Sequence, residues 1–407
     1  MLPMHPYLPQ RPLRRFPSGL CALLAVSIAC GQSPRIRIDG WRGDPDPTGL
    51  VTGTGYWQGR PGSWISFHLE RSAPTLRLSW NDASGVWTNA FPDRSCCYYP
   101  YPTRPESYVV LGSKNSSDGT DGTWDTLLRV EGNPVGASSQ VFRAQGNEWI
   151  RFVQLAGSSN LDEVRIHDQD ALGADSWFFV GNSITEESFK WYRPDTTFPE
   201  HVAILDGSRS PAIVRAGISG VTAVEVARSI DDYRRHAKGV GHWAIELGTN
   251  DAWRNRAPGV DEYRSALIAI VEGALANEAV PIVARIPATN PVSAGWQIDQ
   301  GYLDVVDSVT RAYGLPVGPD FHGWFLAHPE ELSIDGVHPN SAGAASIHRL
   351  WAEVALEEVA PPIRPAPQIV RPAAAVLVWR PGERSLDGID FFGRTYRGGA
   401  GIVLRRP

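Results

Sequence analysis

Cysteine is scarce in this chain of 407 residues, which limits the chemistry that depends on thiols. The four cysteines are Cys21, Cys30, Cys96 and Cys97, and they form no Cys-x-x-Cys pair. A zinc ribbon is therefore excluded. Cys96 and Cys97 are neighbours, so both a strained disulfide in an oxidising compartment and a pair of thiols remain open. No metal site can be built from this pair alone.

Several short motifs that assign a function directly are also missing. The sequence contains no Gly-x-Ser-x-Gly, no His-Glu-x-x-His and no Gly-x-x-x-x-Gly-Lys. These absences argue against the larger α/β-hydrolase class, metalloproteases and P-loop proteins. The net charge is -6 and no basic stretch occurs beyond the N-terminus, so neither nucleic acid nor an anionic membrane surface is an expected partner. No metal or organic cofactor is expected.

Apolar runs of membrane-spanning length are absent as well, and the longest run lies near the N-terminus. Residues 20–29 are apolar or small, follow three arginines, and precede the polar sequence that begins after Cys30. This order is typical of a secretory signal peptide, and the run is too short to span a membrane. We predict a signal peptide over residues 1–30 and a secreted, periplasmic or cell-surface location. Cys30 also resembles a lipoprotein acceptor, so lipidation there and plain secretion both remain open.

The hydrophobic pattern changes once along the chain, and the length suggests two domains. Residues 35–170 alternate apolar and polar side chains between turns, which predicts an antiparallel all-β domain. Residues 174–360 alternate strand-like and helix-like segments, which predicts an α/β domain with a parallel sheet. Residues 361–407 form a proline-rich linker and a short β-like tail. The expected strands are 64–69, 75–80, 108–111, 148–153, 163–166, 212–214, 243–247 and 281–286.

Four short segments of the α/β region carry side chains suited to catalysis: residues 181–185, 218–220, 248–251 and 335–338. The first follows an apolar run, so Ser183 is expected on the turn after a strand, where a hydroxyl is exposed. Acyl transfer by a serine needs a base, a carboxylate that orients the base, and donors for the oxyanion.

The residues of the four segments fit these roles. Ser183 is the candidate nucleophile, His338 the base and Asp335 the orienting carboxylate. The candidate oxyanion donors are the N–H groups of Ser183 and Gly220 and the side chain of Asn250.

The four segments resemble the signature blocks of the SGNH (GDSL-like) hydrolase superfamily. The resemblance covers about residues 174–360 and implies a three-layer α/β/α sandwich with a shallow active site at the C-terminal strand ends. Asn182 departs from the pattern, because the family usually has aspartate beside the nucleophile. This change removes a charge but no member of the triad, so it affects the expected substrate preference more than the expected activity.

Residues 115–124, 149–152 and 161–164 resemble a discoidin-type, galactose-binding-like jelly roll. That resemblance implies glycan binding by loops at one end of the sandwich. The tyrosine-rich loop 91–101 is the candidate, although a loop that packs against the catalytic domain would show the same composition.

We therefore expect an exported serine esterase that removes a small acyl group, acetyl above all, from a carbohydrate. Trp191, Tyr192 and Trp253 follow two of the blocks and are candidate substrate-binding residues, although aromatic core residues would produce the same pattern. One alternative is an acyltransferase that uses the same triad with a cell-wall or polysaccharide hydroxyl as acceptor. The other is a glycan-binding adhesin with an inactive hydrolase domain.

Overall fold

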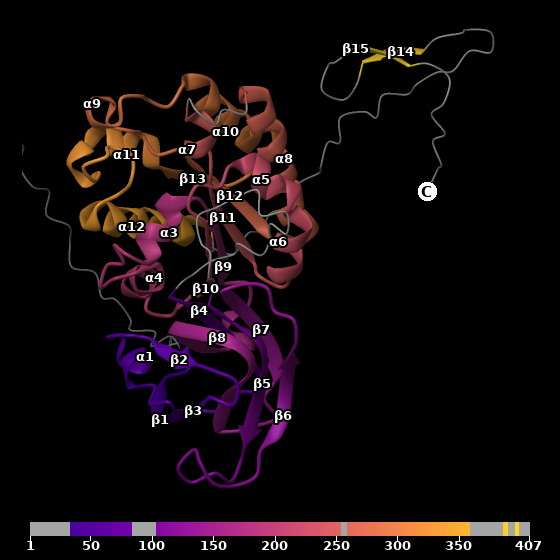
Figure 1. Cartoon of the computed structure of the whole chain (residues 1–407), viewed down its shortest axis with the longest axis vertical. Coiled ribbons are helices and arrows are strands. Elements are labelled where there is room, and N and C mark those ends of the chain that lie inside the picture. Colours follow the sequence, from indigo (N-terminus) through magenta and orange to yellow (C-terminus); the bar gives the residue numbers. More distant parts are fainter. Residues whose placement is uncertain (1–32, 84–102, 254–258, 359–385, 390–394, 399–407) are drawn as a thin grey trace, which may run out of the picture. The chain divides into compact units, whose positions relative to one another are not determined.

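The computed structural model describes residues 33–83, 103–253, 259–358, 386–389 and 395–398 (Figure 1). Several predictions lie outside these residues: the signal peptide, Cys30, the pair Cys96 and Cys97, the loop 91–101 and most of the segment 361–407. In the part of the chain that is described, no helix is both long and apolar enough to cross a membrane.

Antiparallel strands make up most of residues 38–168. Their bounds are β1 Ile38–Asp44, β2 Trp57–Gly59, β3 Trp64–Leu69, β4 Thr75–Asp82, β5 Arg104–Ser113, β6 Asp125–Val130, β7 Ala137–Arg143 and β8 Trp149–Asp168, with the short helices α1 Thr48–Thr52 and α2 Gln169–Leu172. One buried cluster that includes Trp57, Trp80 and Phe152 fills this strand-rich region. The likeness to a galactose-binding-like jelly roll stays a prediction.

Strand β8 differs from the expectation, because the sequence predicts two separate strands over its length. The structure joins them into a single strand of 20 residues. Its first part pairs with β3 and β5 and its second part with β2 and β4. Gly157 has φ +81, and a Cβ there would meet the carbonyl of Arg104. Glycine thus allows β8 to change partners without ending.

The α/β region is built on a parallel sheet in the order β10-β9-β11-β12-β13. The strands are β9 Ser176–Gly181, β10 Ala212–Gly217, β11 His242–Glu246, β12 Val280–Arg285 and β13 Val317–Asp320. The helices are α3 Ser183–Phe189, α4 Phe198–Leu205, α5 Ala223–Arg228, α6 Ile230–His236, α7 Thr249–Ala252, α8 Val260–Ala276, α9 Pro291–Ala294, α10 Gln300–Tyr313, α11 Phe321–Ala327 and α12 Ser341–Glu358.

Helices cover both faces of this sheet (Figure 1). Alternate side chains of β9 enter different cores: Phe178 and Val180 pack with residues of α5, α6, α8 and α10, whereas Trp177 and Phe179 pack with residues of α3, α4, α11 and α12. A strand buried on both faces has this continuous apolar sequence. The predicted α/β fold with a parallel sheet is confirmed, and it positions the ends of β9, β10 and β11 side by side.

Strand β10 is the edge of the parallel sheet, and the strand-rich region covers it. Asn81 of β4 accepts a hydrogen bond from the backbone N–H of Arg215 at 3.0 Å. An exposed edge strand presents unpaired backbone N–H and carbonyl groups. This contact provides a hydrogen-bond acceptor for one of the N–H groups of β10. Near the end of the chain, β14 Leu386–Ile389 and β15 Thr395–Gly398 pair antiparallel.

Candidate active site

Ser183 lies where strand β9 ends and helix α3 begins, as the sequence predicts. Asn182 is the N-cap of α3, and its side-chain oxygen accepts a hydrogen bond from the N–H of Ile184 at 2.8 Å. The turn is tight, because a Cβ on Gly181 would collide with the side chain of Thr185. Asn182 thus takes over the capping role that aspartate also fills, which explains why the departure from the family pattern leaves the turn intact.

Residues 335–338 bring the predicted base and carboxylate to this serine. His338 Nε2 lies 2.8 Å from Ser183 Oγ, and His338 Nδ1 lies 2.6 Å from Asp335 Oδ2. Oδ1 of Asp335 accepts hydrogen bonds from Ser333 Oγ and from the N–H groups of Val337 and His338 at 2.7–3.0 Å. Serine, imidazole and carboxylate are thus connected in the order that nucleophilic catalysis requires.

The hydrogen bonds to Asp335 keep it ionised. Burial alone would raise the pKa of its carboxyl, but the donors from His338, Val337 and Ser333 outweigh that effect and lower the pKa to about 2. A carboxylate that stays charged over the neutral range holds the Nδ1–H tautomer of the imidazole, which leaves Nε2 to accept the serine proton.

A second carboxyl group, Glu246 at the end of β11, lies beneath the turn. It accepts hydrogen bonds from Thr185 Oγ1 at 2.9 Å and from Asn182 Nδ2 at 3.2 Å. Burial raises the pKa of Glu246 to about 8, although these donors work in the opposite direction. Glu246 therefore ties the residues on both sides of Ser183 to the neighbouring strand. The sequence analysis did not identify this residue, because a single glutamate at the end of an apolar strand carries no motif.

The second and third blocks meet each other beside the first. Asn250 Nδ2 donates a hydrogen bond to the carbonyl of Val221 at 2.9 Å, and both carboxylate oxygens of Asp251 accept from the N–H of Ala223 at 3.0 Å. Gly220, in the turn before Val221, has φ +80, a conformation that favours glycine. The structure thus joins the segments that carry the candidate oxyanion donors.

Glu186 joins the second block to helix α3. Its Oε2 accepts from both the N–H and the Oγ of Ser219 at 2.7 Å, and its Oε1 accepts from Lys190 Nζ at 2.9 Å. The neighbouring Glu187 faces the triad, with Oε1 3.8 Å from His338 Nε2. The sequence analysis missed Glu187, although its position four residues after Ser183 on one helix was a usable signal.

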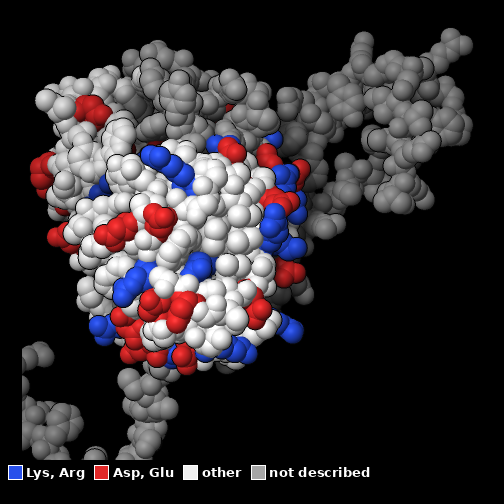
Figure 2. All heavy atoms as spheres, turned by 60° about the horizontal axis from the view of Figure 1, so that its bottom comes forward, with Lys and Arg blue, Asp and Glu red and all other residues white. Residues whose placement is uncertain are grey.

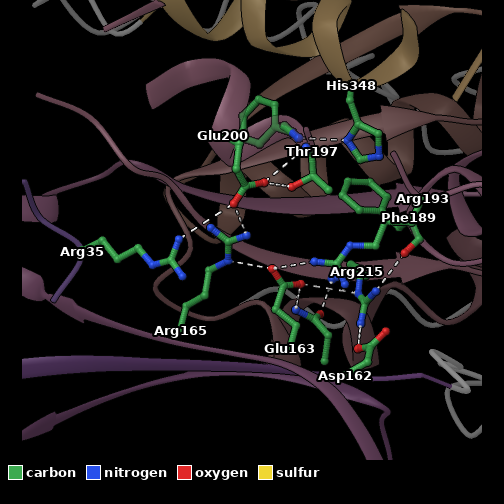
Figure 3. Close-up of polar contacts among 12 residues, drawn as sticks. Arg35, Asp162, Glu163, Arg165, Phe189, Arg193, Thr197, Glu200, Arg215 and His348 are labelled. Carbon is green, nitrogen blue, oxygen red and sulfur yellow. Dashed lines mark hydrogen bonds and ion pairs between the residues drawn. The ribbon is translucent and has the colours of Figure 1, made fainter. Parts of the chain in front are cut away.

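The C-terminal end of helix α3 is held from the strand-rich region (Figure 3). Arg215 of β10 donates to the carbonyl of Phe189, the last residue of α3, at 2.9 Å, and it pairs with Asp162 of β8. Arg165 of β8 bridges Glu163 and Glu200, with 2.6 Å to each carboxylate. The helix that begins with the candidate nucleophile therefore ends on a buried cluster of charged residues.

The candidate substrate-binding residues lie near the surface. Trp191 and Trp253 are 64% and 40% exposed, and Tyr192 is half-buried. Trp191 lies just beyond α3 and Trp253 just beyond α7, the helix that contains Asn250. Both indoles are more open than core packing would leave them, so they are available to a ligand.

Within the described residues, no three His, Cys, Asp or Glu side chains form a group that could hold a metal ion. What the site provides is a serine hydroxyl on a strand-to-helix turn, hydrogen-bonded to an imidazole that an ionised carboxylate orients. Such an arrangement is chemically suited to nucleophilic acyl transfer.

Residues 179–345 match the GDSL-like lipase/acylhydrolase family, which supports an SGNH-type hydrolase domain and, with it, an esterase. A thioesterase 1/protease 1/lysophospholipase L1 from Escherichia coli K12 is 25% identical over 173 residues, which are 42% of this chain and 78% of that protein.

Two bacterial enzymes are among the solved structures that are similar to part of this chain. An acetylxylan esterase from Geobacillus stearothermophilus is 22% identical, with a TM-score of 0.36 over 44% of this chain and 93% of its own. A lipase/acylhydrolase from Enterococcus faecalis is 18% identical, also with a TM-score of 0.36, and the match covers 44% of this chain and 93% of its own.

Proposed function

We propose that the protein is an exported serine esterase that removes a small acyl group, acetyl above all, from a carbohydrate. The observation that carries the proposal is the continuous hydrogen-bonded series Ser183 Oγ, His338 Nε2 and Nδ1, and Asp335 Oδ2, with distances of 2.8 and 2.6 Å. The match of residues 179–345 to the GDSL-like family supports the esterase part of the proposal.

The reaction begins when Ser183 Oγ attacks the ester carbonyl carbon and its proton passes to His338 Nε2. The carbon–oxygen bond to the sugar then breaks, and the proton on Nε2 passes to the leaving sugar oxygen. Water repeats the two steps on the acyl-enzyme, releases the acid and restores the serine. Asp335 stays ionised throughout and stabilises the imidazolium.

The tetrahedral oxyanion needs donors that are already in place. We assign this role to the N–H groups of Ser183 and Gly220 and to the Asn250 amide. The hydrogen bond from Asn250 Nδ2 to the Val221 carbonyl supports the assignment, because it fixes the amide beside the segment that contains Gly220.

A carbohydrate substrate is supported by the open aromatic side chains next to the blocks, Trp191 and Trp253. Indole rings offer an apolar face to sugars and a polar N–H at the edge. The preference for acetyl follows from the shallow site that the family resemblance implies.

Glycan binding by the strand-rich region is a further part of the proposal. In Figure 2, where the lower end of Figure 1 comes forward, acidic and basic side chains both surround a largely uncharged middle. A face without one dominant charge suits a neutral polymer better than a polyanion. Retention of the full-length Ser183→Ala variant on a column of acetylated polysaccharide tests this part.

Transfer of the acyl group to a hydroxyl of a cell-wall polymer uses the same triad, so it remains the second candidate. Product analysis distinguishes the two: free acetate identifies hydrolysis, whereas acetylated acceptor identifies transfer. An adhesin with an inactive hydrolase domain is the third candidate, and the intact hydrogen bonding of the triad argues against it.

The decisive experiment compares wild type with Ser183→Ala on aryl esters of graded acyl length and on acetylated polysaccharides. Loss of the nucleophile should lower kcat by roughly 10⁶, and an organophosphonate should label Ser183 in the wild type only. Acetyl esters should react faster than octanoyl esters. Near wild-type turnover in Ser183→Ala would refute the esterase assignment, and a preference for octanoyl esters would indicate a lipase-like activity instead.

A further inference from the structure

Glu187 is an acidic residue of the site to which the mechanism above gives no role. It lies one helical turn after Ser183 on α3, and residues four apart on a helix lie on the same face. Its Oε1 is 3.8 Å from His338 Nε2, the nitrogen that also lies 2.8 Å from Ser183 Oγ. The nitrogen that moves the proton therefore faces a hydroxyl and a carboxyl group.

The surroundings of Glu187 limit its contact with water. Its side chain is 16% exposed, so water screens a charge there only in part. Burial and the charges of Glu186 and Asp335 raise the pKa of Glu187 above its ordinary value, whereas the charge of His338 lowers it. Of these neighbours, Glu186 is already bonded to Lys190 and Ser219. Around the Glu187 carboxyl group, the neighbouring ionisable side chains are Glu186 from α3 and Asp335 and His338 from the loop before α12.

The position of Glu187 matters for the second half of acylation. In that step the leaving alcohol oxygen accepts the proton from His338 Nε2, so the leaving group lies against this nitrogen. A carboxylate 3.8 Å from the same nitrogen is then a close neighbour of the leaving group. A negatively charged alcohol would be repelled by this carboxylate at short range, whereas a neutral alcohol would experience no such repulsion.

We propose that Glu187 determines specificity by charge: it disfavours esters of anionic alcohols, such as uronic acid residues, and it favours neutral sugars. This inference rests on the proposed esterase function and names a substrate class within it.

A matched pair of esters tests the proposal. The acetate esters of 3-hydroxybenzamide and 3-hydroxybenzoate have nearly the same shape. Only the second ester carries a carboxylate on its leaving group; the first carries a neutral amide in that position. The wild type should prefer the neutral ester in kcat/KM by about tenfold at about pH 8. Glu187→Gln should reduce this ratio toward one.

Two further variants complete the test. Glu187→Asp keeps the charge and should retain most of the preference for the neutral ester. Glu353→Gln removes an exposed charge on α12 and should not change the ratio. An unchanged ratio in Glu187→Gln would overturn the proposal. Ser183→Ala must abolish turnover of both esters; if it does not, the esterase assignment fails instead.

Discussion

Two clusters of charged side chains lie at the two ends of helix α3, and they differ in exposure. At its beginning, the side chains of His338 and Asp335 are 29% and 46% exposed. At its end, Arg165 and Glu163 are 5% and 6% exposed (Figure 3). The open cluster leaves the imidazole partly exposed, although Ser183 itself is only 9% exposed. The buried cluster pairs its arginines with carboxylates and joins the strand-rich region to β10.

Charged side chains thus have a catalytic role proposed at one end of α3 and a structural role at the other. Burial alone would raise the pKa of Glu163, but Arg165, Arg193 and Arg215 outweigh it and hold the pKa of this carboxyl well below its usual range. Such a group is charged over the neutral pH range. The strand-rich region is therefore attached to the hydrolase fold by contacts that a freely detachable binding module would not need.

Loss of one partner of the buried cluster should have the largest effect on stability. Glu163→Ala removes the carboxylate that Arg165 and Arg215 share and leaves each with one ion-pair partner, Glu200 and Asp162 respectively. Removal of one partner of a buried ion pair costs about 3–5 kcal/mol. Denaturant unfolding measures the change. Glu131→Ala, which removes the exposed pair with Arg129, should stay within about 1 kcal/mol. Equal effects of the two variants would contradict the distinction between buried and open charges.

At the candidate active site, Asn250→Ala should lower kcat by roughly 10²–10³ with little change in KM, because an oxyanion donor acts mainly in the transition state. Steady-state kinetics on an acetyl ester measures both constants. Asn277→Ala is the control, since its amide donates to the Arg234 carbonyl at the end of α6. A rise in KM alone would make Asn250 a ground-state contact.

Glu246 differs from both clusters, because it is buried and accepts hydrogen bonds from the neutral side chains of Asn182 and Thr185. Burial raises its pKa to about 8, so the folded protein keeps a proton that the unfolded chain releases near its ordinary pKa of about 4.3. Its contribution to stability is thus complete below about pH 4 and is lost as pH rises through about 8.

Glu246→Gln should therefore be less sensitive to pH than the wild type. Between about pH 5.5 and 7.5 the wild type should lose on the order of 2 kcal/mol that the variant keeps. Thermal unfolding at several pH values measures this slope. Parallel curves for the two proteins would show that Glu246 is ionised in the folded state.

The smallest effect is expected at Trp253, the exposed aromatic residue just beyond α7. Trp253→Ala should raise KM for acetylated oligosaccharides by roughly 2- to 10-fold and leave kcat nearly unchanged, since an aromatic contact contributes about 0.5–1.5 kcal/mol. Val280→Ala trims a side chain of similar exposure at the start of β12, the end of the strand opposite the site, and serves as the control. A fall in kcat without a rise in KM would assign Trp253 to the oxyanion side of the site.

The sequence allowed the open cluster to be predicted but not the buried one. Ser183, Asn250 and His338 each lie in a short motif after a strand or before a helix, so local pattern was enough to bring them together. Glu163 and Arg165 alternate with apolar residues along β8, and such alternation is also typical of a solvated face. Only the packing of β8 against β10 shows that these charges are buried, and that packing depends on contacts distant in the sequence.

The 20-residue strand β8 also has a consequence for the order in which the molecule is assembled during synthesis. β8 completes the strand-rich region, and β10 follows it in the chain. N-terminal units generally fold first as a chain is made. The carboxylates of Asp162 and Glu163 are then in position before Arg215 emerges, so β10 meets a preformed partner, and Arg215 can hold the end of helix α3 only after that.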